Sequence, residues 1–221
     1  MPRSRRYIKK LAERVSEHRR QKPERTVEVW AFDEQRVGLK PILRRQWAPK
    51  GQRPTAVVQH RFEWLYLDGF VHPSTGEVVW FICNAVGIDL FAAVLAAFAQ
   101  TVGAETVGAE TVGAETVGAG AGKLIILVLD NAGWHVSDKL IVPEGIELAF
   151  LPPYTPELQP AEHLWPLTNE AVANQHFATL KDLDAALGER CRTLAAMPEA
   201  IKARTHFGWW PAPGPIAPAP N

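Results

Sequence analysis

Alternation of apolar and polar residues predicts three strands in the first part of the chain. Residues 26–34 alternate in this way and are rich in β-branched and aromatic side chains, so we expect a strand that ends at Phe32-Asp33-Glu34. Residues 63–71 and 78–86 predict a hairpin whose turn is Pro73 to Gly76. These three strands would form one antiparallel sheet.

The second part of the chain predicts two more strands and several helices. A run of six apolar residues, Leu124 to Leu129, predicts a buried strand that ends at Asp130, and residues 146–154 predict another. Helical spacing or capping signals mark the remaining elements. The predicted helices are residues 5–20, residues 90–100 after the N-cap Asp89, a short helix at Ser137 to Ile141, one that begins near Pro160, and one that follows the N-cap Thr179.

This order of elements predicts an α+β fold with a five-stranded mixed sheet flanked by helices. It is the order of a ribonuclease-H-like domain, in which the first and fourth strands lie side by side at the centre of the sheet. That arrangement would bring Asp33 and Asp130 together, because each lies at the end of one of these strands.

Composition agrees with one soluble domain and short appendages. The chain has 221 residues, of which 47% are hydrophobic and 22% charged. The longest apolar run is too short to cross a membrane, and no apolar signal peptide follows the basic N-terminus. Cys83 and Cys191 lie in dissimilar contexts, which favours neither a disulfide framework nor a zinc site and indicates a reducing, cytoplasmic setting.

Charge is distributed unevenly along the chain. Residues 1–25 contain ten Lys or Arg and three Glu, so their net charge is +7. The rest of the chain carries a net charge of −7, because the whole chain is neutral. A basic arm or linker that contacts a polyanion is one interpretation, and a solvated charged helix is the other. Its apolar stripe is narrow, so the helix either packs on another element or is mobile.

Two segments of biased composition divide the chain further. Residues 101–122 contain four copies of TVGA, which we interpret as a surface insertion without a catalytic role; a binding element is the alternative. Residues 208–221 are rich in proline and predict a disordered tail. The main domain is therefore expected at residues 26–196.

Three acidic residues are the candidate chemistry. Asp33 and Asp130 end strands, and Glu162 lies near the start of a helix after a proline-rich loop. Carboxylates gathered in this way can hold two Mg²⁺ ions for phosphodiester cleavage or transfer. Taken singly, the same residues could be a turn residue, a helix cap and an acid favoured by a helix dipole.

Several short motifs make the chain resemble the catalytic domain of mariner-like bacterial insertion-sequence transposases, which belong to the DDE superfamily of endonucleases. The similarity spans about residues 27–195, and its last block is the most specific. The matching residues are Phe32-Asp33-Glu34 with Gly38-Leu39, Trp47 with Lys50-Gly51, Leu129-Asp130-Asn131-Ala132 with His135, and Leu151-Pro152-Pro153-Tyr154-Thr155-Pro156-Glu157-Leu158 with Pro160, Glu162, His163, Leu164 and Trp165.

The resemblance implies a ribonuclease-H-like DNA transposase that uses two Mg²⁺ or Mn²⁺ ions held by Asp33, Asp130 and Glu162. It would hydrolyse DNA at transposon ends and join the freed 3′-hydroxyl to target DNA, as a homodimer in the bacterial cytoplasm at the nucleoid. The sequence departs from the family at three places. The segment between Asp130 and Glu162 is slightly shorter than usual, and Gln159 stands where the family usually has Asn. Pro166 falls early in the predicted helix that contains Glu162. The helix-turn-helix region that reads the ends is absent, which implies a separate DNA-binding chain from a split reading frame, or a decayed copy.

Supporting residues surround this acidic site in the sequence. Asn131, His135 and Glu34 are expected to support the carboxylates, although His135 could equally cap a short helix. Basic residues and one Trp could contact DNA phosphates and bases, or belong to solvated surfaces. These candidates are Arg44, Arg45, Trp47, Lys50 and Arg53, with Arg5, Arg6, Lys9 and Lys10 near the N-terminus.

Two other functions remain open from the sequence. One is a ribonuclease-H-like nuclease that does not transfer strands. The other is an inactive transposase remnant that serves as a DNA-associated interaction module. The block around Glu162 favours transposition over the first, and the intact carboxylates argue against the second.

Overall fold

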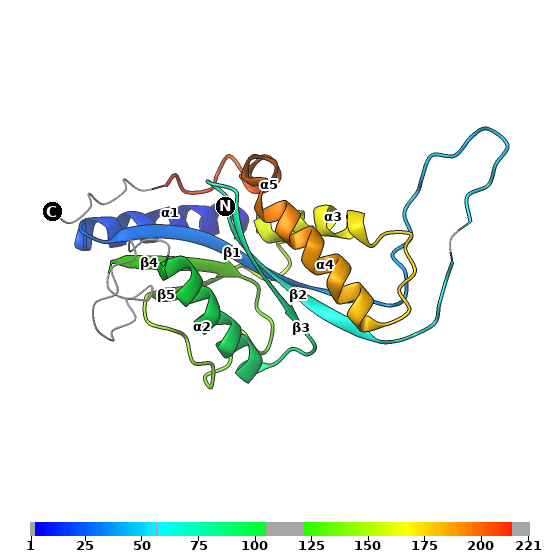
Figure 1. Ribbon diagram of the computed structural model, residues 1–221. Helices are drawn as coiled ribbons and strands as arrows, with labels where there is room; N and C mark the ends of the chain where they lie inside the picture. The colour runs from blue at the N-terminus through cyan, green and yellow to red at the C-terminus, as the bar shows by residue number, and fades with distance from the viewer. Residues whose placement is uncertain (1–2, 56, 105–121, 214–221) are drawn as a thin grey trace.

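The structure is a computed structural model that describes residues 3–55, 57–104 and 122–213, and a five-stranded mixed sheet forms its centre (Figure 1). The strand order β3-β2-β1-β4-β5 confirms the predicted α+β fold. Neighbouring strands among the first three are antiparallel, whereas β4 is parallel to both β1 and β5. The strands are β1 (Thr26–Gly38), β2 (Trp64–His72), β3 (Glu77–Cys83), β4 (Lys123–Leu129) and β5 (Ile146–Phe150).

Helices cover both faces of the sheet (Figure 1). On one face, α2 (Ile88–Ala104) packs against alternate residues of β1, including Trp30 and Phe32. On the other, α1 (Arg3–Gln21) packs with the opposite set, including Val29 and Ala31. Because side chains alternate across a strand, this two-sided burial explains why central strands are apolar almost throughout.

The C-terminal helices lie on the same face as α1. The predicted helix after Thr179 is confirmed as α4 (Leu180–Ala195), whose N-terminus carries a capping box between Thr179 and Asp182. A further helix, α5 (Pro198–Thr205), was not predicted. It packs against the β2–β3 turn, where a Cβ on Gly76 would lie 1.9 Å from the carbonyl oxygen of Pro198.

The segment that contains Glu162 is not the regular helix that we expected. It consists of two 3₁₀ turns, η1 (Pro156–Leu158) and η2 (Pro160–Leu164), followed by α3 (Trp165–Thr168) and η3 (Asn169–Ala171). Each new element begins with proline at one of its first two positions, except η3. Pro166 therefore lies in a first helical turn, where proline is tolerated, and does not interrupt a helix.

Other predicted elements differ in extent. β1 continues to Gly38, beyond the expected end near Asp33. The predicted helix at Ser137 to Ile141 is wrong, since these residues form turns. The Ser137 hydroxyl accepts a hydrogen bond from the Lys139 amide (3.2 Å), a local bond that competes with helix formation.

The repeat and the tail are only partly described. Helix α2 begins at Ile88, so Asp89 lies inside its first turn, and it continues through the first repeat copy to Ala104. Residues 105–121 and 214–221 lie outside the described residues. Trp210, in the segment expected to be a tail, is buried against the α1 side of the sheet. No helix in the described ranges is long and apolar enough to cross a membrane.

Candidate active site

Strand register brings Asp33 and Asp130 to the same end of the sheet. The last parallel pair between β1 and β4 is Ala31 with Val128, and each aspartate lies two residues further along its strand direction. Both aspartates therefore continue the face on which Ala31 and Val128 are buried. This is the face that η2 covers, which places Glu162 opposite them.

Gln159 fixes the start of the segment that carries Glu162. Its side chain is buried, donates from Nε2 to the Phe32 carbonyl (2.9 Å) and accepts from the Ala161 amide (3.3 Å) as the N-cap of η2. The family's usual Asn is one methylene shorter. In this chain Gln159 thus connects η2 to the residue that precedes Asp33.

A single pocket contains all three acidic residues. Asp33, Asp130 and Glu162 line a cavity of about 330 Å³, together with the loop from Leu151 to Pro156. Among the described residues, no three His, Cys, Asp or Glu side chains are gathered closely enough to hold a metal ion as they stand. The structure therefore brings the predicted carboxylates to one pocket without forming a closed set of metal ligands.

Asp130 is held by two hydrogen bonds to the same oxygen. Its Oδ1 accepts from the Ala132 amide (3.0 Å) and lies 2.8 Å from Nδ1 of His135. The hydrogen bond from His135 is the largest influence on the Asp130 carboxyl and lowers its pKa, against the opposing effect of burial. His135 is therefore a support for Asp130 rather than a helix cap.

Burial raises the pKa of Asp33 to about 7. Its Oδ2 accepts a 2.8 Å hydrogen bond from the Trp165 indole, which opposes that rise, while the charges of Glu162 and Asp130 add to it. Burial also raises the pKa of Glu162, with a smaller contribution from Asp130. These acidic groups therefore favour a proton or a cation in the pocket.

Glu34 lies on the opposite face of β1, behind the pocket. Burial raises its pKa to about 8, and the charges of Asp33, Asp130 and Asp68 add to the rise. Its Oε2 is 3.6 Å from Nε2 of His135, and neither atom has a hydrogen-bond partner among the described residues. Glu34 and Asp130 thus lie near different nitrogens of the same His135 ring.

Asp68 is a buried acid that the sequence analysis missed. It pairs with Glu34 across β1 and β2 and accepts from the Cys83 thiol (3.5 Å), and burial raises its pKa to about 6. The sequence signal that could have found Asp68 is an acidic residue inside the otherwise apolar strand WLYLDGFVH.

Asn131 has a different role from the one expected. Its side chain donates a hydrogen bond to the Leu151 carbonyl (2.6 Å), so it fixes the loop that lines the pocket.

The basic candidates fall into two separate regions. Residues 39–55 and 57–63 form an excursion between β1 and β2 that projects beyond α4, at the opposite end of the molecule from most of α1 (Figure 1). Arg45, Trp47, Lys50 and Arg53 are exposed on this excursion. Arg44 is also exposed, but its guanidinium donates to the Pro166 carbonyl (3.1 Å). Arg5, Arg6, Lys9 and Lys10 are exposed on α1.

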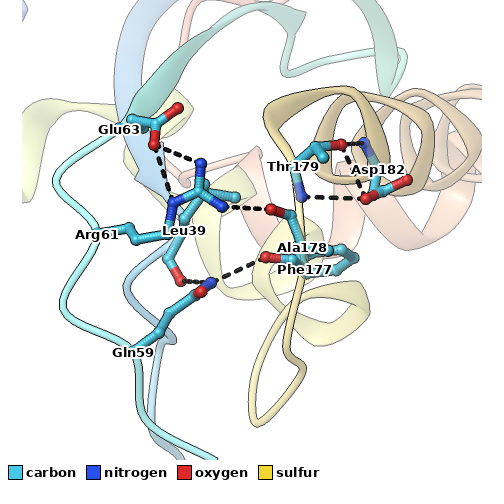
Figure 2. Close-up of polar contacts among 8 residues, drawn as sticks. All are labelled: Leu39, Gln59, Arg61, Glu63, Phe177, Ala178, Thr179 and Asp182. Carbon is cyan, nitrogen blue, oxygen red and sulfur yellow. Dashed lines mark hydrogen bonds and ion pairs between the residues drawn. The ribbon is translucent and has the colours of Figure 1, made fainter.

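The base of the excursion is fixed to the segment before α4 (Figure 2). Nε2 of Gln59 donates to the carbonyls of Leu39 (2.6 Å) and Phe177 (2.9 Å). Arg61 donates to Glu63 and to the Ala178 carbonyl, next to the N-cap of α4. The excursion is therefore anchored at its base and exposed beyond it.

Comparison with known proteins agrees with the fold. The chain is 33% identical over 121 residues to an uncharacterized protein, y4pE/y4sA, of Sinorhizobium fredii (strain NBRC 101917 / NGR234), which covers 54% of this chain and 77% of that protein. Two solved structures are similar in fold. The Mos1 strand transfer complex matches with a TM-score of 0.53 at 16% identity, over 93% of this chain and 61% of the Mos1 chain. The Mos1 mariner paired end complex with Mn matches with a TM-score of 0.53 at 15% identity, over 93% and 62%.

The chain thus spans about three fifths of the Mos1 chains that it matches. These similarities concern the ribonuclease-H-like fold. The family model of the DDE superfamily endonucleases matches residues 28–184, a segment that contains all of the sheet except the first two residues of β1, and all three acidic residues of the pocket. The chain belongs to the DDE superfamily endonucleases.

Proposed function

We propose that this chain is the catalytic domain of a DNA transposase that cleaves phosphodiester bonds and transfers strands at transposon ends. The observation that carries the proposal is the pocket that Asp33, Asp130 and Glu162 share within a DDE endonuclease domain. The Mos1 structures that share this fold are a strand transfer complex and a paired end complex with Mn, which supports this class of reaction.

Asp33, Asp130 and Glu162 fit divalent cations in donor chemistry. Mg²⁺ and Mn²⁺ prefer carboxylate oxygens, and a pair of ions would neutralise charge at the attacking and leaving oxygens of a phosphodiester. Both hydrogen bonds to Asp130 fall on Oδ1, so they fix its carboxylate without using Oδ2. Glu162 is exposed on η2 and can rotate toward the two aspartates to complete the ligand set.

Two successive displacements at phosphorus make up the proposed reaction. In the first, a water oxygen bonds to phosphorus as the bond to the 3′-oxygen breaks, and that oxygen leaves as a hydroxyl after taking a proton. In the second, this 3′-hydroxyl attacks a target phosphodiester and displaces another 3′-oxygen. Hydrogen bonds from His135 and the Ala132 amide orient the Asp130 carboxylate, and Pro152 and Pro153 form one wall of the pocket.

DNA is the proposed partner of the exposed basic residues. Arg45, Lys50 and Arg53 on the excursion and Arg5, Arg6, Lys9 and Lys10 on α1 would contact phosphates, and the fully exposed Trp47 would stack on a base. Arg44 would contribute mainly to the base of the excursion. A homodimer would hold two DNA ends together, and a separate helix-turn-helix chain would recognise them.

A plasmid assay tests the reaction. The full chain is incubated with Mn²⁺, supercoiled plasmid and a labelled oligonucleotide with a free 3′-hydroxyl. Plasmid nicking and transfer of label to the plasmid are both expected for the wild type and lost in Asp130→Ala. Asp138→Ala removes an exposed carboxylate from the same connection and should retain both activities.

Each alternative gives a different result in this assay. Nicking without joining, lost in Asp130→Ala, would favour a nuclease that does not transfer strands. Binding of DNA without nicking or joining, together with no heat of Mn²⁺ binding by calorimetry, would contradict the enzymatic proposal and favour an inactive remnant.

A further inference from the structure

Trp165 connects the segment that carries Glu162 to Asp33. It lies three residues after Glu162, at the start of α3, and its Nε1 donates a 2.8 Å hydrogen bond to Oδ2 of Asp33. Gln159, three residues before Glu162, donates to the carbonyl of the neighbouring Phe32 (2.9 Å). Glu162 is therefore flanked by two side chains that bind successive residues of β1.

Gly69 provides the space that the Trp165 ring occupies. It pairs directly with Asp33 across β1 and β2. A Cβ at this position would lie 3.0 Å from Trp80 Cζ3, 3.1 Å from Leu164 Cδ1 and 3.1 Å from Trp165 Cη2. Distances this short would force the side chains to shift, so the absence of a side chain at Gly69 sets how closely the indole approaches the sheet.

We propose that Trp165 is a positioning residue that orients the Asp33 carboxylate and sets its distance from Glu162. The inference rests on the proposed function, because Asp33 and Glu162 are there assigned to hold divalent cations. An indole N–H is a donor only, so this bond restrains Oδ2 and selects one rotamer of Asp33.

Trp165→Phe removes the N–H group and keeps an aromatic ring over Gly69. Substitution of residues that orient metal ligands typically weakens metal affinity about 10–100-fold, and we expect a loss of at least about tenfold in Mn²⁺ affinity. DNA affinity measured without metal should remain unchanged, since Trp165 is not among the proposed DNA contacts.

Trp80→Phe is the matched control. Trp80 belongs to the same cluster, with its ring centroid 6.5 Å from that of Trp165, and its buried Nε1 has no hydrogen-bond partner among the described residues. This variant deletes the same chemical group without touching a carboxylate. Its Mn²⁺ affinity should stay within about twofold of the wild type, as expected for separable sites.

The experiment combines calorimetry with NMR on the full chain. Calorimetry measures Mn²⁺ affinity for the wild type and both Trp variants, after urea unfolding has verified that each is folded. ¹H–¹⁵N spectra of the metal-free wild type follow the indole resonances, and the Trp165 signal is assigned by its loss in Trp165→Phe. Asp33→Asn should shift this signal more than any other indole signal, and Mn²⁺ should broaden it at the lowest concentrations.

The outcomes separate this inference from the proposed function. Weaker Mn²⁺ binding by Trp165→Phe alone, with the expected indole shift, supports the positioning role. Equal Mn²⁺ affinities for the wild type and Trp165→Phe overturn it and leave the proposed function standing. If the wild type binds no Mn²⁺, the proposed function fails. If Trp165→Phe does not fold, the absence of any indole signal that both shifts in Asp33→Asn and broadens at the lowest Mn²⁺ concentrations overturns the inference.

Discussion

Burial and mutual repulsion set the behaviour of the acidic residues around the pocket. Burial raises the pKa values of Asp33 to about 7, Glu34 to about 8 and Asp68 to about 6. Asp130 differs because the His135 hydrogen bond lowers its pKa. Without metal, Glu34 is therefore largely protonated and Asp33 partly protonated at pH 7, while Asp130 is ionised.

These raised pKa values predict that the metal-free chain loses stability as pH rises from 6.5 to 8.5. In the unfolded state the same carboxyls release their protons near pH 4, whereas the folded state keeps them until pH passes about 7 for Asp33 and about 8 for Glu34. The folded state binds more protons in this window, so the free energy of unfolding must fall as pH rises. Urea unfolding with a chelator present measures the decline.

Glu34→Gln supplies the comparison for this pH series. It removes the group with the highest raised pKa in the pocket region and should make the decline between pH 7 and 8.5 smaller. Asp138→Asn changes an exposed carboxyl and should leave the slope unchanged. A free energy of unfolding that rises with pH over this range would contradict the assignment of protons to Asp33 and Glu34.

Sequence reasoning identified the pocket carboxylates and named His135, which contacts Asp130, but it missed Trp165, the partner of Asp33. Asp33 and Asp130 could be brought together by strand order alone, because register depends on the periodic apolar pattern. The Trp165–Asp33 bond joins residues 132 positions apart and depends on the space left by Gly69. The sequence around Trp165 and the sequence around Gly69 do not indicate that these residues meet at Asp33.

Elements with strong periodicity were predicted well, and elements defined by local hydrogen bonds were not. Helix α4 matches its prediction because Thr179, Asp182 and a regular apolar stripe all indicate the same start. The segment around Glu162 contains too many prolines for a regular helix and adopts 3₁₀ turns. Helix α5 has a weak apolar stripe, and its position depends on contact with the β2–β3 turn.

Contact with α5 predicts an unusually large effect of Gly76→Ala. Gly76 has a φ of +82°, and an added Cβ would lie 1.9 Å from the Pro198 carbonyl oxygen. Left-handed backbone costs a non-glycine residue about 1–2 kcal/mol, and the clash must add to that cost. We expect the free energy of unfolding to fall by more than about 2 kcal/mol, measured by urea denaturation.

Gly51→Ala separates the two causes. Gly51 has a similar φ of +88°, but nothing lies within 4 Å of its added Cβ. This variant should lose only about 1 kcal/mol or less, because the exposed turn can relax. Equal losses in the two variants would show that α5 does not press on the turn as described.

The fold combines a compact body with one exposed excursion, and the basic residues lie on both. Sequence patterns left open whether residues 5–20 form a mobile arm or a packed helix. In the structure, α1 buries Leu11 and Val15 on the sheet, and Arg14 and His18 both bond to Glu147 at its edge. Ser4 also donates a 2.8 Å hydrogen bond to Glu157 of η1. The basic surface of α1 is therefore held at a fixed position relative to the pocket.

Packing of α1 against the sheet predicts that Leu11→Ala destabilises the whole molecule. Leu11 is 3% exposed within the core of that face, and Leu→Ala substitutions in cores cost about 2–5 kcal/mol. Urea unfolding should remain a single transition with a midpoint shifted to lower urea, because the helix and sheet share one core. The exposed Lys10→Ala should change the free energy of unfolding by less than about 0.5 kcal/mol. A separate early transition, or no change in Leu11→Ala, would instead mean that α1 unfolds independently and that its basic residues move relative to the pocket.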